Sequence, residues 1–106
     1  MSGEAGWVDV CPADRLGVGD AVAFDWQDHS FAIYRTASGY FATDGTCTHE
    51  EADLTEGLVL GDVIECPLHQ GRFHIPSGRA LGAPVCVNLR IYKVRLASGR
   101  LLICVG

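Results

Sequence analysis

The chain has 106 residues, of which 48% are hydrophobic, and its formal net charge is −5. This length predicts one domain over residues 1–106, with a modest buried core. A membrane span and a secretory signal are excluded, because no apolar run is long enough and the first residues lack the basic and apolar regions of a signal peptide. An acidic chain is also a poor nucleic-acid binder. We expect a cytoplasmic protein with no membrane or nucleic-acid partner.

The first half of the chain shows the alternation of apolar and polar residues that is typical of β-strands. Strands are predicted over residues 7–11, 21–26, 31–35 and 40–43. Pro12 ends the first of them, because proline cannot continue a ladder. The short turn Ala37-Ser38-Gly39 predicts a hairpin between the last two.

Beyond Gly45 the pattern changes, and residues 46–61 are polar and acidic with no sustained period. Two short strands are predicted after them, at 63–66 and 71–75, and a closing hairpin at 89–96 and 100–105. No stretch of helical length carries a helical period, so at most one short helical turn is expected. The sequence predicts an all-β fold: a small antiparallel β-sandwich or barrel base with an inserted segment at about residues 44–84.

The inserted segment holds two pairs of metal-binding residues. Cys47-Thr48-His49 is followed, after sixteen residues, by Cys66-Pro67-Leu68-His69. Two thiolates and two imidazoles suit either a zinc ion or a [2Fe–2S] cluster with both histidines on one iron. Zinc fingers commonly pair Cys with Cys and His with His, the second pair on a helix. Here each pair mixes the two residue types, and no helical pattern follows His69.

The motif resembles that of the Rieske iron–sulfur family, Cys-x-His followed at a similar distance by Cys-x-x-His, and the resemblance covers nearly the whole chain. It implies that Cys47 and Cys66 hold one iron of a [2Fe–2S] cluster, and that His49 and His69 hold the other. Two thiolates cancel the charge of the oxidised cluster core, whereas four would leave it doubly negative. A two-His centre is therefore easier to reduce than an all-Cys centre.

High-potential members of the family carry a disulfide between the two cluster loops, and a Ser and a Tyr after the second His that donate to sulfur. The corresponding positions here include Leu68, Gly71 and Phe73, which supply neither a spare thiol nor a hydroxyl. Hydrogen bonds to sulfur stabilise the reduced state. We therefore expect a reduction potential near the low end of the Rieske range, roughly −150 mV.

The chain lacks what an enzyme of this kind would need. Beyond the motif only His29 and His74 remain, both expected to be ordinary surface or strand residues, and there is no nucleotide-binding glycine loop. The sequence resembles the Rieske-type ferredoxin component of bacterial aromatic-ring dioxygenases. That resemblance implies a soluble, monomeric one-electron carrier between a flavin-containing NAD(P)H-dependent reductase and a terminal oxygenase. Transient docking is expected near His49 and His69, with Glu50, Glu51, Leu68, Gln70 and residues 82–84 at the rim.

Other functions remain open at this point. A zinc-binding interaction module is one, and a Rieske-like small subunit of another reductase is a second, although small subunits of nitrite reductases as a rule lack the four ligands. An oxygenase fragment is a third, which the natural start and the closing hairpin argue against. The remaining cysteines, Cys11, Cys86 and Cys104, are expected to be reduced and to pack as small core residues.

Overall fold

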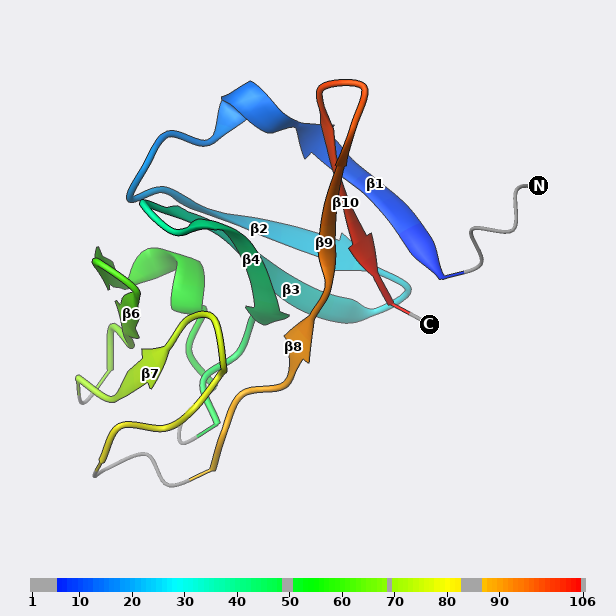
Figure 1. Ribbon diagram of the computed structural model, residues 1–106. Helices are drawn as coiled ribbons and strands as arrows, with labels where there is room; N and C mark the ends of the chain where they lie inside the picture. Colours follow the sequence, from blue (N-terminus) through cyan, green and yellow to red (C-terminus); the bar gives the residue numbers. More distant parts are fainter. Residues whose placement is uncertain (1–5, 49–50, 69, 83–86, 106) are drawn as a thin grey trace.

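The computed structural model describes residues 6–48, 51–68, 70–82 and 87–105. Within these ranges the chain forms three antiparallel sheets (Figure 1). The strands are β1 (Trp7–Pro12), β2 (Ala21–Trp26), β3 (His29–Thr36), β4 (Gly39–Asp44), β5 (Leu58–Leu60), β6 (Val63–Glu65), β7 (Arg72–His74), β8 (Ile91–Tyr92), β9 (Val94–Ala97) and β10 (Arg100–Cys104).

Two of the sheets form the base. One has the strand order β1-β10-β9 and the other β2-β3-β4-β8. A core of apolar side chains from both sheets lies between them, contributed by Cys11, Leu16, Phe31, Ile33, Ala42, Leu101 and Ile103. The base is therefore a small antiparallel sandwich, as the sequence predicts.

The strand β3 lies at the centre of the molecule, because it is buried on both faces. Phe31 and Ile33 face the base core, while Ala32 and Tyr34 face a second core. Successive side chains of a strand point to opposite sides of its sheet, so one strand serves both cores. The sheet β2-β3-β4-β8 is thus the middle layer of three.

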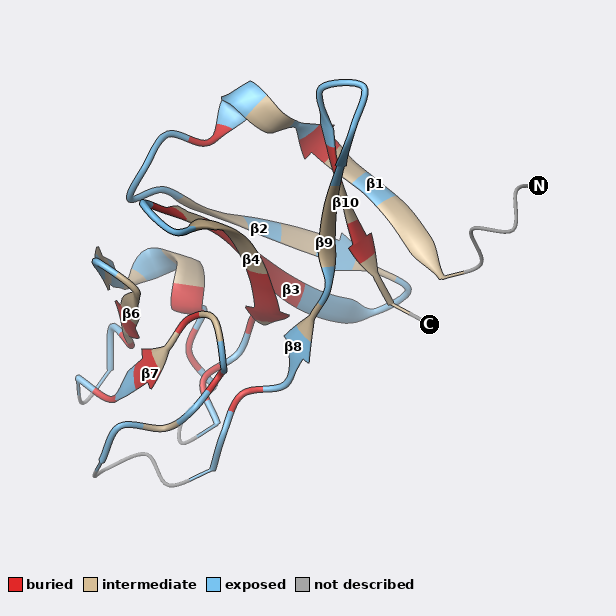
Figure 2. Ribbon diagram, in the orientation of Figure 1, coloured by how far each residue is buried: buried red, intermediate tan, exposed pale blue. Residues whose placement is uncertain are grey.

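The third sheet, β5-β6-β7, covers the other face of this middle layer together with the loops between β4 and β8. Its strands have only three residues each, and one residue of β6 and one of β7, Ile64 and Phe73, are fully buried. Figure 2 shows buried residues on β6, on β7 and in the loops around these strands. We call residues 45–90, between β4 and β8, the loop segment.

Several local predictions need correction. The strand expected over 89–96 is two strands, since β8 pairs with β4 whereas β9 pairs with β10. The strand β5 was not predicted, because its neighbours are polar and acidic. Two 3-10 turns occur, Ala13–Arg15 and Leu54–Glu56, where at most one helical turn was expected. No helix in the described part of the chain is long and apolar enough to cross a membrane.

Candidate metal centre

The first ligand loop follows β4. Gly45 donates its N–H to the Ser30 carbonyl at 2.9 Å, which anchors the start of the loop to β3. The Cys47 N–H donates to the Ala52 carbonyl at 3.0 Å, so the loop closes on itself five residues after the cysteine. The Cys47 side chain is buried, with 5% of its surface exposed.

The second ligand loop follows β6 and closes in the same way. The Cys66 N–H donates to the Gly71 carbonyl at 2.7 Å, again five residues further on. Cys66 is 1% exposed, whereas Leu68 at the tip of the loop is 48% exposed. Gln70 has a positive φ of 56°, which turns the chain back toward β7. Both predicted loops therefore hold a buried cysteine where the loop closes, and in the second loop the tip beyond it is exposed at Leu68.

The two cysteines belong to one core cluster. Cys47 and Cys66 pack there with Tyr34, Phe73 and Leu89, among others. His49 and His69, the other two predicted ligands, lie outside the described residues. Two thiols that are brought together in an apolar, water-poor cluster fit the thiolate half of an iron–sulfur site, since such clusters are held by cysteine thiolates. The two described donors, Cys47 and Cys66, therefore agree with the predicted cofactor.

A close backbone contact fixes the first loop against the third sheet. Gly57 follows the 3-10 turn, and a Cβ at this position would lie 2.0 Å from the Glu65 carbonyl oxygen. Only a glycine allows this approach, since no real Cβ tolerates such a distance. At the other end of the turn, Asp53 Oδ1 accepts the Thr55 N–H at 2.9 Å and its hydroxyl at 2.6 Å. The turn is held at both ends.

Residues 87–89 connect the first ligand loop to the strand that follows the second. The Thr48 hydroxyl donates to the Val87 carbonyl at 2.7 Å. Asn88 Oδ1 accepts the Ala80 N–H at 2.9 Å, and Leu89 donates to the Gly78 carbonyl at 2.7 Å. Ala80 in turn bridges to Phe73 on β7. Sequence reasoning missed this connection, since nothing in the pattern pairs position 48 with position 87.

Tyr34, which packs in the same core cluster as the cysteines, shares a buried hydrogen bond with Thr43. The Thr43 hydroxyl donates to the Asp44 carbonyl at 2.7 Å, so its oxygen must accept the proton of Tyr34, at 2.8 Å. Burial raises the pKa of Tyr34, which keeps this hydroxyl protonated. Phe73, which stands where high-potential relatives are expected to carry a tyrosine, is fully buried without a hydroxyl of its own. The donor that Tyr34 offers is already used by Thr43.

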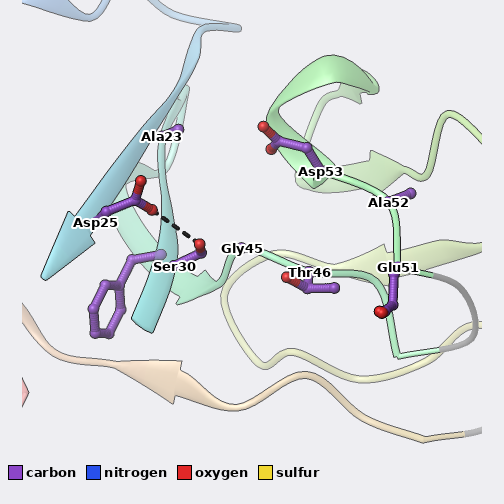
Figure 3. A pocket seen from close by; sticks show the side chains of 9 residues that line it. Ala23, Asp25, Ser30, Gly45, Thr46, Glu51, Ala52 and Asp53 are labelled. Atoms are coloured by element: carbon purple, nitrogen blue, oxygen red, sulfur yellow. Dashed lines mark hydrogen bonds between the residues drawn. The ribbon is translucent and has the colours of Figure 1, made fainter. Parts of the chain in front are cut away.

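An acidic hollow lies beside the first ligand loop (Figure 3). It has a volume of about 330 Å³ and lies between the β2–β3 hairpin and residues 45–53. Carboxylates of Asp25, Glu51 and Asp53 line it, and Asp25 accepts the Ser30 hydroxyl at 2.9 Å. Such a surface favours a cationic side chain over an anion.

The remaining predicted residues occupy structural positions. His29 Nε2 lies 2.7 Å from Asp44 Oδ1, and His74 Nδ1 lies 2.7 Å from the Ser77 hydroxyl. Cys11 is buried in the base core as predicted. Cys104 is only partly buried, so the expectation of a core position was wrong for it. Leu101 and Ile103 of β10 face the base core, and alternation along the strand points Cys104 to the opposite face. Cys86 lies outside the described residues.

Comparisons with known proteins agree with this geometry. The family model of the Rieske [2Fe-2S] domain matches residues 6–93. The ferredoxin component of the naphthalene 1,2-dioxygenase system of Pseudomonas aeruginosa is 38% identical over 97 residues, which are 92% of this chain and 93% of that protein. A chain in the complex of reduced oxygenase and oxidized ferredoxin in carbazole 1,9a-dioxygenase superposes with a TM-score of 0.90 at 34% identity, covering 93% of each chain.

A more distant likeness concerns the fold alone. The terminal oxygenase of carbazole 1,9a-dioxygenase from Nocardioides aromaticivorans IC177 matches with a TM-score of 0.86 at 20% identity. The match covers 97% of this chain but 31% of that chain. The family match and the near relatives both span most of the sequence, including both cysteine loops. The chain therefore belongs to the Rieske [2Fe-2S] domain family, and its cofactor is one Rieske-type [2Fe–2S] cluster.

Proposed function

We propose that this protein is a monomeric, cytoplasmic one-electron carrier that takes electrons from a flavin-containing NAD(P)H-dependent reductase and delivers them to the terminal oxygenase of an aromatic-ring dioxygenase. The observation that carries the proposal is the likeness over 92% of the chain to a dioxygenase ferredoxin component, together with the buried pair Cys47 and Cys66. The chain acts as an electron-transfer component and does no substrate chemistry of its own.

The proposed ligands are the thiolates of Cys47 and Cys66 and the imidazoles of His49 and His69. When bound, the cluster accepts and returns a single electron. The chain's own contribution is rigidity and exclusion of water. Each cysteine is buried, and each sits at the closed base of a loop, so the two thiolates keep their positions.

The proposed docking surface surrounds the tips of the two ligand loops, near His49 and His69. Leu68 is exposed at one tip, and Glu51 lines the acidic hollow beside the other. A lysine or arginine of a redox partner would find carboxylates there. Such charges steer encounter and make association depend on ionic strength.

Spectroscopy of the purified protein tests the cofactor and its ligands. A brown-red protein with iron and sulfide in equal amounts, and an EPR signal only after reduction, is expected. A colourless protein with stoichiometric zinc would contradict the proposal. His69→Cys and His49→Cys variants are each expected to change the EPR spectrum while the protein remains coloured, because a thiolate replaces an imidazole on the iron.

Kinetics test the carrier role and the docking surface. The protein should restore turnover to a mixture of ferredoxin reductase and terminal oxygenase from a naphthalene-type system. Charge reversal at Glu50 and Glu51 is expected to slow electron transfer at low salt, with a smaller effect at high salt. Reversal of Asp14, an exposed carboxylate on the 3-10 turn after β1, is the matched control. Equal rates for both reversals would remove these glutamates from the docking surface.

A further inference from the structure

The two sheets of the base separate where the chain passes from β8 in one sheet to β9 in the other, and we call this gap the seam. The ladder between β4 and β8 ends at the pair Ala42↔Tyr92. After Lys93 the chain no longer follows β4, and from Val94 it pairs with β10 instead. A continued ladder would have placed Val94 opposite Tyr40. These two residues are where the strands separate.

An apolar groove of about 590 Å³ occupies this seam. Its wall includes Trp7 of β1, Tyr40 and Phe41 of β4, Pro76 of the loop segment, and Ile91 and Val94 beside the break. Ile91 is 48% exposed, and Leu96, further along β9, is 54% exposed. In Figure 1 the β9–β10 hairpin stands at the top of the molecule, away from the third sheet.

The outer edge of β9 offers unpaired backbone groups along this groove. Within the described ranges, β9 is the last strand of its sheet and pairs only with β10. The Cys104 N–H donates to Lys93, so in an antiparallel ladder Arg95 and Ala97 also point their backbone groups at β10. The N–H and C=O groups of Val94 and Leu96 therefore point away from it. An exposed edge of this kind is a template for a further strand.

The charge near the groove is positive, although the protein as a whole is acidic. The two charged residues that line the groove, Lys93 and Arg95, are both basic. Lys93 lines the groove, and Arg90 lies just before it with its guanidinium 5.4 Å from the Tyr92 ring centroid. The Arg95 guanidinium lies 4.4 Å from the Trp7 ring centroid. Cations are thus placed along an apolar channel.

We propose that this groove docks an extended, acidic segment of a protein partner, which adds to the outer edge of β9 as a further strand. Its backbone pairs with Val94 and Leu96, its apolar side chains lie in the groove, and its carboxylates face Lys93 and Arg90. The surface lies apart from the ligand loops, so the proposal does not rest on the electron-carrier function.

A second copy of this chain is a poor occupant of the same edge. Antiparallel pairing of two β9 strands would bring Lys93 and Arg95 of one copy near those of the other. Like charges across a strand pair are destabilising, and basic residues on edge strands commonly prevent self-association. Charge therefore favours an acidic partner over a dimer.

The test uses the oxidised holoprotein and a synthetic peptide in which glutamate alternates with valine. The control peptide carries lysine in place of glutamate. In amide spectra, the acidic peptide should shift the signals of the groove and slow hydrogen exchange at Val94 and Leu96. Exchange at Arg95 should not change, since its N–H already faces β10. The lysine peptide should produce neither effect.

Two variants distinguish binding at the groove from a general effect of the protein's net charge. Lys93→Glu should weaken binding of the acidic peptide about tenfold, because an attraction becomes a repulsion. Arg79→Glu makes the same change of charge on the loop segment and should weaken binding by less than about twofold. Unchanged exchange at Val94 and Leu96, equal binding of the two peptides, or equal effects of the two variants would overturn the proposal. The proposal would also be overturned if sedimentation showed a dimer of the protein alone and hydrogen exchange showed Val94 and Leu96 protected in that dimer.

Discussion

The base and the loop segment are built differently. The base strands β1 to β4 have six to eight residues, and they pair in long ladders over an apolar core. The strands of the loop segment have three residues each, and its core contains the two cysteines that we propose as ligands. The base can be stabilised by burial and ladder hydrogen bonds alone. The loop segment has little regular structure of its own, so we expect the bound cluster to supply much of its stability.

The largest expected effect comes from removing one of the proposed thiolate ligands, which tests whether only the loop segment depends on the cluster. Cys66→Ser should abolish visible absorbance and lower amide-exchange protection between residues 51 and 82, while β2, β3 and β4 keep theirs, because the base does not depend on the cluster. Cys11→Ala is the matched control, since Cys11 is also buried but lies in the base core. Full colour in Cys66→Ser, or uniform loss of protection, would contradict this division.

The next effect concerns the contact between the 3-10 turn and β6. Gly57→Ala should destabilise the protein by about 3 kcal/mol in urea unfolding, because the new Cβ cannot be accommodated without moving the backbone of Glu65. Gly61 is the control: its φ is 63°, and a Cβ there meets nothing within 4 Å. Gly61→Ala should therefore cost about 1 kcal/mol, the penalty of the left-handed conformation. Equal costs would show that the contact is not tight.

A smaller effect is expected on the midpoint potential, from hydroxyl groups at positions 73 and 34. Phe73→Tyr places a hydroxyl in the cysteine core and should raise the midpoint potential by about 50 mV, since a donor to sulfur favours the reduced state. Tyr34→Phe should leave the potential nearly unchanged, because that hydroxyl donates to Thr43. Redox titration measures both. A wild-type midpoint above about +100 mV would contradict the expected low-potential cluster.

The smallest effect is a pH dependence in the base. Burial, with the hydrogen bond to Asp44, raises the pKa of Tyr92 from 10.0 to about 12. The folded chain therefore keeps a proton that the unfolded chain releases in this range. The raised pKa of Tyr92 adds fully to the free energy of unfolding below pH 10, and this contribution is lost as the pH rises toward 12. Tyr92→Phe should flatten this decline in alkaline urea titrations, with a remainder from Tyr34. An unchanged slope would exclude Tyr92 as its source.

The sequence pattern was most informative for strands whose two faces each pack against a fixed layer of the fold. Alternation predicted β1, β2 and the hairpin of β3 and β4, because their side chains face fixed layers. It missed that β3 begins at His29, since the turn before it uses Gln27 and Asp28 with positive φ in place of glycine. The break at Lys93 was also missed, because it depends on which of two neighbours each half of the strand meets.

For the candidate site, the motif could be predicted from the sequence because two cysteines and two histidines stand at short, regular spacings. The cysteines are described and lie together, whereas the two histidine positions stay predictions. The contacts that hold the two cysteine loops in place could not be predicted from the sequence. The Gly57–Glu65 approach and the Thr48–Val87 hydrogen bond join positions far apart in the chain, and neither residue type marks its partner. The extent of the domain and of its inserted segment likewise stays a prediction.

The pairing of β1 with β10 has a consequence for how this fold is used. Trp7 lies opposite Cys104, so the first and last strands of the described chain run side by side, and Figure 1 shows both strands on the side away from the third sheet. A module whose ends lie together can be inserted into a longer polypeptide without disturbing its interior. The oxygenase in which the same fold makes up 31% of the chain is consistent with such modular reuse. One fold could thus be kept while the polypeptide that is joined to it changes.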